Sequence, residues 1–330
     1  MTGTTATEDT LVSVDKTSVL PISVVIPVLN EEANIGECLE SVRFADEIFV
    51  VDSGSTDRTV EIAESHGAKV VQFRFQPGGL RKKNWALENL PFRNEWVLLL
   101  DADERVTPEL EAEIRQEFQC SPKCDGFYLN RKLIFMGRWL RHGGNYPSWN
   151  LRLFRHCLGR YEKLETEELE SAGDVEVHEH VVLNGRAGYL RAPLLHLDYK
   201  DISRWIARHN NYSTWDAKMR LRLLQGEEFS QSIRPRLFGD PVERKRWLKK
   251  LWVRLPCRPL LRFIYMYFIR LGFLDGKQGF IYAVLKATHE FHITVKMWEM
   301  RRQNESTVAQ IQQTRSVMPG NHKRPKPASR

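Results

Sequence analysis

Short apolar runs alternate with amphipathic segments along the first third of the chain. Residues 22–29 form a continuous apolar run rich in β-branched side chains, which is typical of a strand buried on both faces. Further strands are predicted at residues 48–51, 69–73 and 96–100, with helices capped by Asn30 and by Thr56 or Asp57, over residues 80–90, and from Pro108. This alternation predicts an α/β fold with a doubly wound, mostly parallel sheet.

The pattern changes after about residue 124. Strands are predicted at residues 126–131, 150–155, 175–183 and 187–191, and the turn at Asn184-Gly185 predicts a hairpin between the last two. A helix is predicted over residues 201–225, and prolines before residue 241 mark a boundary. We therefore expect a flexible lead-in over residues 1–20 and a domain over residues 21–240, with halves at 21–124 and 125–240. A C-terminal region of different composition follows.

Charge is divided unevenly between the domain and the C-terminal region. The chain of 330 residues has a net charge of +7. Residues 241–330 hold 19 Lys and Arg against 5 Asp and Glu, a net charge of +14, so residues 1–240 carry −7. A basic segment of this size indicates an anionic partner, either nucleic acid or a membrane surface.

Aromatic residues distinguish between these two partners. Residues 247–300 contain eleven Phe, Tyr and Trp side chains among regularly spaced Lys and Arg. This mixture is typical of amphipathic helices that lie in the headgroup region of an anionic membrane, and no nucleic-acid-binding motif is present. We therefore expect membrane-associating helices over residues 241–302 and no nucleic-acid partner. The alternative is that these helices pack on the domain. Residues 303–330 are polar and are predicted to be disordered.

Targeting and redox signals favour the cytoplasm. The five cysteines are odd in number and scattered, so they form no disulfide framework. The N-terminus has no apolar secretory signal, and no window reaches 18 uncharged apolar residues. Together with the basic aromatic region, these features predict a cytoplasmic protein that is peripheral on the cytoplasmic face of the inner or plasma membrane.

Polar residues cluster where the predicted parallel strands end. Asn30 and Glu31 follow the first strand, Asp52 the second, and Asp101 with Asp103 the fourth. Ligands of open α/β sheets bind outside these carboxyl ends. The chain has neither a glycine-rich dinucleotide fingerprint nor a P-loop, so phosphate would need a metal. Two aspartates at i and i+2 project to one side of an extended segment, which predicts a Mg²⁺ or Mn²⁺ site completed by substrate phosphates.

Several longer segments carry a recognisable pattern. In the first half they are SVVIPVLNEEANIGECLESV, ADEIFVVDSGSTDRTVEIAESHGAKV, GLRKKNWAL and WVLLLDADERVTPEL. Later ones are GRWLRHGGNYPSWNLRLFR, the triplet VHE at Val177–Glu179, and RLGFLDGKQGFIYAVL. In this order they resemble the family 2 glycosyltransferases with the GT-A fold, and more narrowly the lipopolysaccharide-core β-glucosyltransferases. The resemblance covers about residues 22–300.

The resemblance implies a function and roles for individual residues. It implies inverting, metal-dependent transfer of a sugar, with glucose favoured, from a nucleotide-diphosphate donor, with UDP favoured, to a glycolipid or lipopolysaccharide-core-type acceptor. Contacts to the nucleoside and base are implied for Pro27, Asn30, Glu31 and Asp52, and contacts to the nucleotide for Lys83 and Asn84. Asp101 is expected to reach the ribose or the metal, and Asp103 to bind the metal, which stabilises charge on the departing diphosphate.

An inverting transfer also needs a carboxylate that takes the proton of the attacking hydroxyl. Glu179 is predicted as this base because it matches the family triplet, and Glu104 is the alternative. His178 is expected to contact the metal or the diphosphate. The competing interpretation is that His178, Glu179 and His180 are exposed, alternating residues of the predicted hairpin.

A segment rich in aromatic residues and glycine is the candidate acceptor site. Its members Trp139, Arg141, His142 and Trp149 flank Gly143-Gly144, and aromatic faces with Arg and His suit a phosphorylated sugar. Core packing explains the two tryptophans equally well. The Glu-rich loop at residues 157–173 departs from the family pattern and speaks against a heptose-phosphate acceptor.

Two other classes of protein fit parts of the pattern. A nucleotidyltransferase that makes nucleotide sugars would carry a glycine-rich, Arg-containing loop after the first strand, where this chain has Leu29, Asn30 and Glu31. The other class is a non-catalytic nucleotide-binding or membrane scaffold, and the catalytic assignment would be wrong if Asp103→Ala and Glu179→Ala each left sugar transfer intact.

Overall fold

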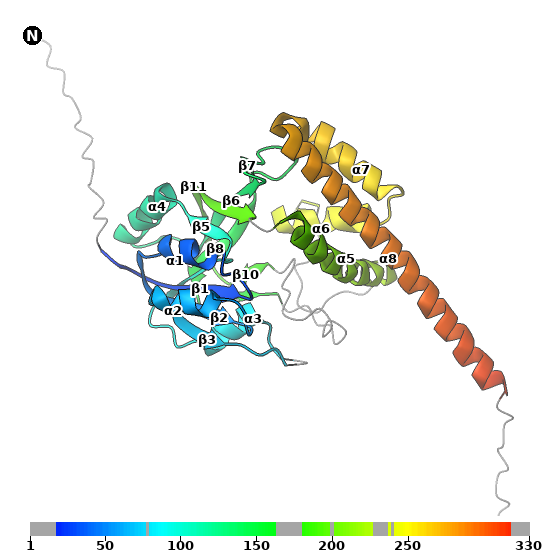
Figure 1. The fold of residues 1–330 in the computed structure, drawn as a ribbon, viewed down its shortest axis with the longest axis horizontal. Coiled ribbons are helices and arrows are strands. Elements are labelled where there is room, and N and C mark those ends of the chain that lie inside the picture. Colours follow the sequence, from blue (N-terminus) through cyan, green and yellow to red (C-terminus); the bar gives the residue numbers. More distant parts are fainter. Residues whose placement is uncertain are drawn as a thin grey trace, which may run out of the picture.

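The computed structural model describes residues 18–76, 79–162, 180–198, 201–226, 237–238 and 241–317. An α/β domain lies at one end of the molecule, and a group of helices from the C-terminal part of the chain lies at the other (Figure 1). The domain contains the helices α1 (Ile35–Glu40), α2 (Thr59–Ser65), α3 (Lys82–Asn89) and α4 (Pro108–Gln119).

The first half of the sheet is parallel. Its strands, in spatial order, are β3 (Lys69–Gln72), β2 (Ala45–Asp52), β1 (Leu20–Val28) and β4 (Trp96–Leu99). Val28 of β1 lies beside Asp52 of β2, and Val25 of β1 lies beside Leu99 of β4. The residues that follow these three strands therefore emerge at one edge of the sheet, as the sequence pattern predicts.

Helices cover both faces of this half of the sheet. Val24 and Ile26 point to the face on which α1, α2 and α4 pack, whereas Val25 points to the face covered by α3. Alternate residues of β1 thus enter two separate cores, which explains the continuous apolar run. The doubly wound α/β class is confirmed.

The predicted helix starts have different outcomes: the start at Pro108 is confirmed, the cap at Asn30 is wrong, and α2 begins after Arg58, with Asp57 accepting the Thr59 N–H at 3.0 Å. Thr107 caps α4, its hydroxyl accepting the backbone N–H of Leu110 at 3.1 Å. Asn30 does not cap α1, which begins after Asn34. Asn30 has a positive φ of 54°, and its side chain accepts the backbone N–H of Thr56 at 2.8 Å. The amide therefore ties together two loops at the edge of the sheet.

The second half of the sheet is mixed. After β4 it continues through β8 (Trp149–Arg155), β6 (Gly126–Phe135), β11 (Ala187–Asp198) and β5 (Glu104–Val106), and the short β7 (Arg138–Trp139) pairs with β6. Of these contacts, β6 with β11 is parallel and the others are antiparallel. Because β5 follows the metal-binding candidates directly, its pairing with β11 brings β11 against them.

The predicted hairpin around Asn184-Gly185 is wrong in its pairing. β10 (Val181–Leu183) pairs with β9 (Gly159–Tyr161), whereas β11 pairs with β6 from Ala187 to Asp198. The long parallel contact with β6 occupies one edge of β11, and β5 occupies the other. A turn signal is local and does not determine which strands meet across a sheet. Residues 175–179 of the predicted strand lie outside the described residues.

The C-terminal helices pack on each other and on the domain. They are α5 (Ile202–Gln225), α6 (Pro241–Trp252), α7 (Arg258–Ile264), the π turn η2 (Tyr265–Ile269), the 3-10 turn η3 (Gly272–Asp275) and α8 (Gly276–Val317). α8 runs along α5 and α7. Phe135 and Leu140 of the domain share an apolar cluster with Trp205, Met266 and Tyr282 of these helices. Packing on the domain, the alternative to membrane association, therefore accounts for one face of this region.

The predicted disorder from residue 303 is wrong for residues 303–317, which continue α8. This stretch contains no Gly or Pro before Pro319, so nothing in its backbone ends the helix. Within the described part of the chain, no helix has the length and apolar content needed to cross a bilayer.

Candidate active site

The loop after β4 carries the central carboxylates. Two hydrogen bonds between Asp101 and Glu104 close this loop. The Asp101 backbone N–H donates to the Glu104 carboxylate at 3.0 Å, and the Glu104 N–H donates to the Asp101 carbonyl at 2.9 Å. Arg105 donates to the carbonyl oxygens of Ala102 and of Asn34 at the start of α1, at 2.7 and 2.8 Å. The loop is thus held rigidly before any ligand arrives.

Cys38 supports this loop from beneath. The thiol lies 3.8 Å from the Asp101 carbonyl oxygen, and burial raises its pKa to about 12. A thiol with this pKa stays protonated at neutral pH, so Cys38 is a packing residue and not a nucleophile.

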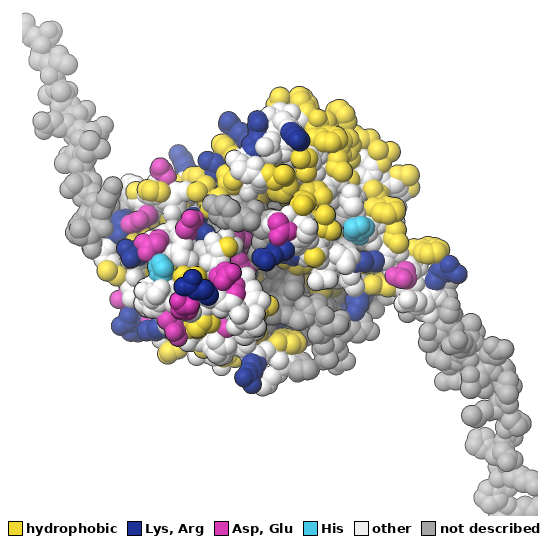
Figure 2. All heavy atoms as spheres, in the orientation of Figure 1, with side chains coloured by type: hydrophobic (Ala, Val, Ile, Leu, Met, Phe, Trp, Pro, Cys, Tyr) yellow, Lys and Arg dark blue, Asp and Glu magenta, His cyan; other side chains and the backbone are white. Residues whose placement is uncertain are grey.

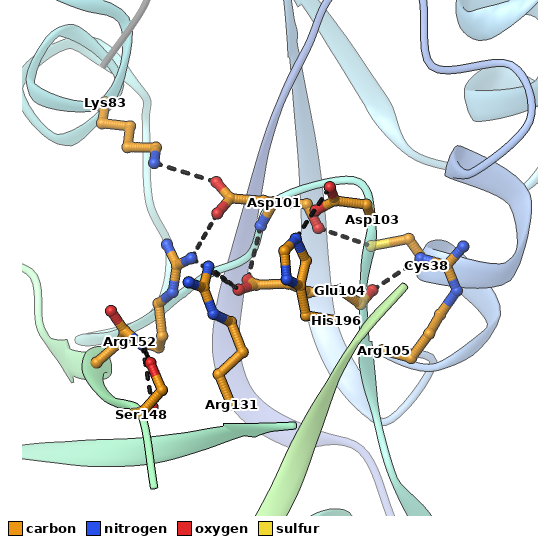
Figure 3. A network of polar contacts seen from close by, with 11 residues as sticks. Cys38, Lys83, Asp101, Asp103, Glu104, Arg105, Arg131, Ser148, Arg152 and His196 are labelled. Atoms are coloured by element: carbon orange, nitrogen blue, oxygen red, sulfur yellow. Dashed lines mark hydrogen bonds and ion pairs between the residues drawn. The ribbon is translucent and has the colours of Figure 1, made fainter. Parts of the chain in front are cut away.

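Asp101 is held between two cations. Lys83 Nζ lies 3.1 Å from one carboxylate oxygen and Arg152 Nη2 contacts the other (Figure 3). Burial works against ionisation, but Arg152 and Lys83 outweigh it and hold the pKa of Asp101 well below its ordinary 3.8. Lys83 therefore lies beside Asp101, and its contact with the nucleotide stays a prediction.

Glu104 is the most deeply buried of the three carboxylates, with no exposed surface. Arg152 Nη2 lies 2.8 Å from its Oε1, and Arg131 Nη1 lies 3.6 Å from the same atom. A carboxylate enclosed in this way orients Arg152 and the loop, and it has no path to an acceptor hydroxyl. The alternative interpretation of Glu104 as the base is therefore not supported by this geometry.

Asp103 faces a histidine that arrives from β11. Its Oδ2 lies 3.2 Å from His196 Nε2, and the Leu197 N–H donates to the Asp103 carbonyl at 2.8 Å. Burial raises the pKa of Asp103, but His196 more than offsets this, so the pKa lies below 3.8. Asp103 is charged at neutral pH and suited to bind a cation.

The Asp103–His196 pair fits a divalent cation. In octahedral coordination at 2.0–2.1 Å, two neighbouring ligand atoms lie about 3 Å apart, close to the observed Oδ2–Nε2 distance. A carboxylate oxygen and a neutral imidazole nitrogen are both established metal ligands. Among the described residues no cluster of three or more such side chains could enclose a metal, so the pair suits an open site that substrate phosphates complete.

Helix α5 adds a further cation and a phenol at this site. The charge of Arg208 helps to lower the pKa of Asp103. Tyr212, one turn further on, has its pKa raised above 10.0, first by burial and then by the charges of Asp101 and Asp103. The C-terminal helices therefore contribute to the site and are more than an attachment to the domain.

The residues predicted to contact the nucleoside and base form the neighbouring part of this edge. Asp52 accepts hydrogen bonds from the Gly54 and Ser55 N–H groups and from Gln72 Nε2, at 2.9–3.2 Å. Glu31 accepts one from Asn34 at 2.8 Å. Pro27 is the penultimate residue of β1. These contacts shape the loops, and contacts to a donor stay a prediction.

Asn84 differs from its neighbour Lys83. It is buried, and its amide both donates to the Tyr161 carbonyl and accepts from the Tyr161 N–H, at 2.9 Å each. The amide thus holds α3 against β9. Its predicted contact with the nucleotide is untested, and the observed contacts are structural.

The four candidate acceptor residues lie on the far part of the domain, towards the C-terminal helices. Arg141 stacks over Trp139 at 5.3 Å, and His142 Nδ1 lies 2.8 Å from Oδ1 of Asp275, the last residue of η3. Trp149 packs edge-to-face on Tyr189. The structure therefore does not gather these four around one point, and their role in acceptor binding stays a prediction.

Two of the predicted site residues are not among the described residues, and three described site residues were not predicted. His178 and Glu179 lie outside the described residues. Sequence reasoning missed His196, Arg131 and Arg152. All three lie on strands of the mixed half of the sheet, and strand pairing brings them to the loop after β4. A local signal existed only in the conspicuous polarity of Arg152 within the apolar strand β8.

Comparisons with known proteins found relatives among glycosyltransferases. Residues 23–169 match the family Glycosyl transferase family 2. The lipopolysaccharide core biosynthesis glycosyltransferase LpsC of Rhizobium meliloti is 29% identical over 285 residues, which are 85% of this chain and 93% of that protein. A glucosyl-3-phosphoglycerate synthase of Mycolicibacterium smegmatis is 47% identical over 55 residues, 15% of this chain and 18% of that protein.

A likeness to solved structures is partial. The crystal structure of glucosyl-3-phosphoglycerate synthase from Mycobacterium tuberculosis, in complex with Mn²⁺, uridine diphosphate and glucosyl-3-phosphoglycerate, is 26% identical. The overlap covers 34% of this chain and 43% of that one, with a TM-score of 0.28. The family match and the LpsC relative confirm the resemblance to family 2 glycosyltransferases.

Proposed function

We propose that this chain, which carries a family 2 glycosyltransferase domain over residues 23–169, moves a sugar with inversion from a nucleotide-diphosphate donor to a glycolipid acceptor of the lipopolysaccharide-core type. One observation carries the proposal: Asp103 and His196 stand beside Lys83, Arg131 and Arg152 at the carboxyl edge of the parallel strands. The LpsC relative, which spans most of the chain, supports the acceptor class. UDP-glucose is the donor that we favour.

A divalent cation, Mg²⁺ or Mn²⁺, is part of the proposal. Asp103 and His196 would hold it, and when bound it would neutralise charge on the diphosphate leaving group. The chain supplies cations of its own for the same charge. Among the described residues, Lys83, Arg131 and Arg152 lie next to the carboxylates of Asp101 and Glu104, and the charge of Arg208 acts on Asp103.

The transfer itself needs one proton acceptor. The oxygen of an acceptor hydroxyl forms a bond to the anomeric carbon of the sugar from the face opposite the nucleotide. The bond between that carbon and the diphosphate oxygen breaks, and its electron pair leaves with the nucleotide diphosphate. The hydroxyl proton passes to a carboxylate, for which we propose Glu179. Asp101 and Glu104 are engaged with cations and serve to position them.

A screen of donors tests the proposed function. Purified full-length protein, incubated with UDP-glucose, Mn²⁺ and a lipopolysaccharide-core acceptor, is expected to glucosylate the acceptor hydroxyl and release UDP, and removal of the metal by a chelator is expected to abolish both. Other nucleotide sugars are run in parallel. Pyrophosphate formed from a nucleoside triphosphate and a sugar phosphate would instead identify a nucleotidyltransferase. Metal-dependent nucleotide binding without turnover of any donor would identify a scaffold.

Replacing Glu179 with Gln tests the proposed base. The amide cannot accept the hydroxyl proton, so we expect transfer to fall by about 10²- to 10⁴-fold while binding of the donor is retained. Rates are measured with saturating donor, and donor affinity is measured separately by calorimetry. Glu88→Gln, at an exposed position of α3, is the matched control and should transfer at the wild-type rate. Wild-type transfer by Glu179→Gln would assign the base to another residue.

A further inference from the structure

Exposed apolar side chains gather at one corner of the molecule. They come from α7, η2, η3 and the link between η2 and η3, and are between 44% and 65% exposed: Leu260, Phe268, Ile269, Leu271, Phe273 and Leu274. We call these six residues the apolar corner. In Figure 2 hydrophobic side chains cover this part of the surface, at the upper right, where Figure 1 shows α7 and the start of α8. Contiguous apolar surface of this kind marks an interaction site.

The apolar corner is a firmly built turn and not a frayed end. A Cβ on Gly272 would lie 2.7 Å from the Met266 carbonyl oxygen, and one on Gly279 would lie 2.1 Å from the Gly272 carbonyl oxygen. The backbones of η2, η3 and α8 can approach this closely only because both residues are glycine. Met266 and Tyr282 anchor the turn from inside. The packing that buries these residues therefore holds the six apolar side chains outward.

The charge around the apolar corner has one sign. Between Arg258 and Trp298, a stretch that the structure describes throughout, the only acids are Asp275 and Glu290. Both are buried, Asp275 against His142 and Glu290 against Arg220. The exposed ionic residues at the turn are cations, Arg270 and Lys277. The surface thus combines projecting apolar groups with positive charge and no exposed carboxylate.

From these observations we infer that the apolar corner docks on a membrane surface with anionic headgroups. The apolar side chains enter the boundary between headgroups and acyl chains, and Arg270 and Lys277 meet lipid phosphates. A second copy of the chain fits less well. A two-fold interface would pair the apolar corners of two copies, so that Arg270 and Lys277 of one copy would face the same cations of the other.

This inference rests on the proposed function and extends it, because a glycolipid acceptor lies in a membrane and an enzyme that acts on it must reach the membrane surface. The corner is tied to the loop between β7 and β8. The His142 N–H donates to Asp275 at 2.8 Å, the Gly143 N–H donates to the Arg270 carbonyl at 2.8 Å, and Arg138 donates to the Leu274 carbonyl at 3.3 Å. Docking through the corner therefore brings this loop of the catalytic domain to the membrane surface.

Flotation of full-length protein with vesicles tests the inference. The vesicles contain phosphatidylcholine alone or phosphatidylcholine with phosphatidylglycerol. Wild-type protein is expected to float with the anionic vesicles. The double variant Phe268→Glu/Ile269→Glu is expected to lose at least tenfold in bound fraction, because it puts carboxylates into the apolar corner. Arg270→Gln and Lys277→Gln are each expected to weaken binding about fivefold, and only to anionic vesicles.

Val19→Glu is the matched control, since Val19 is 58% exposed and immediately precedes β1, and the α/β domain that contains β1 lies at the other end of the molecule from the helices (Figure 1). Thermal unfolding checks that all variants fold. The inference is overturned if wild-type protein does not float, if the double variant floats as well as wild type, or if light scattering shows a dimer that the double variant dissociates. Metal-dependent UDP binding is measured alongside. Wild-type protein that binds UDP in a metal-dependent way but does not float overturns docking alone, and wild-type protein that floats but does not bind UDP overturns the proposed function alone.

Discussion

Sugar transfer by the Asp103→Asn variant is expected to be at least about a thousandfold slower than by the wild-type chain, because a metal-bound leaving group is stabilised by several kcal/mol. Asp103 is the one carboxylate of the loop whose side-chain oxygen meets His196 and is not enclosed by Lys or Arg side chains at hydrogen-bond distance. The amide keeps the size and a hydrogen bond to His196 but removes the charge. The loss should therefore appear in the chemical step and in metal affinity.

Two measurements separate this effect from damage to the fold. Calorimetric titration of Mn²⁺ in the presence of UDP should show metal binding to wild type and little to Asp103→Asn. Asp46→Asn is the matched control, because Asp46 lies at the opposite end of β2, where it pairs with Arg93. That variant should bind metal and transfer sugar normally. An Asp103→Asn variant that keeps wild-type metal affinity would remove Asp103 from the metal site.

The Glu290→Leu variant is expected to be less stable than wild type by about 3–5 kcal/mol in the free energy of unfolding, because it strands buried charge. Glu290 on α8 is buried and pairs with Arg220 of α5, with Nη2 at 3.0 Å from Oε2, and with Arg258 at the start of α7, with Nε at 3.3 Å from Oε1. Without the carboxylate, two buried guanidinium groups face each other. The three helices that this carboxylate joins should separate first.

Urea unfolding monitored by tryptophan fluorescence measures the loss. Glu299→Gln, at an exposed position on the same helix, should leave the free energy of unfolding unchanged within about 0.5 kcal/mol. The double variant Arg220→Met/Glu290→Leu removes one of the two stranded cations and should recover part of the stability. Equal stability of Glu290→Leu and wild type would show that the helices are joined by apolar packing alone.

Local patterns predicted most of the elements. The apolar run of β1 and the Thr107-Pro108 start of α4 appear where they were expected, because strand burial and helix capping depend on a few consecutive residues. The prediction failed where distant segments compete. β11 pairs with β6 and β5 and not with β10, although the turn between β10 and β11 has a hairpin sequence. The prediction of disorder after residue 302 was wrong for residues 303–317, because it rested on the polarity of this segment and not on its helix propensity.

The sequence indicated the carboxylates of the candidate site but not the residues that contact them. Asp52, Asp101 and Asp103 follow parallel strands, and the topology of such a sheet alone brings them to one edge. The partners of these residues come from strands of the mixed half and from α5. Arg152 is 51 residues from Asp101 along the chain, and His196 is 93 residues from Asp103. Nothing in the sequence around Arg152 or His196 states which carboxylate each would meet.

The basic, aromatic C-terminal region shows the same division. The sequence by itself determined that this region carries cations and more apolar surface than a solvated tail needs, because composition is a property of the chain. It likewise determined the α/β class and the carboxylates at the strand ends, through periodicities that neighbouring residues set. Only the tertiary structure decided that Met266 and Tyr282 turn inward while Phe268 and Ile269 turn outward, and that His196 meets Asp103. Those outcomes depend on which elements share a core or a sheet edge, and that choice is made by the free energy of packing the whole chain.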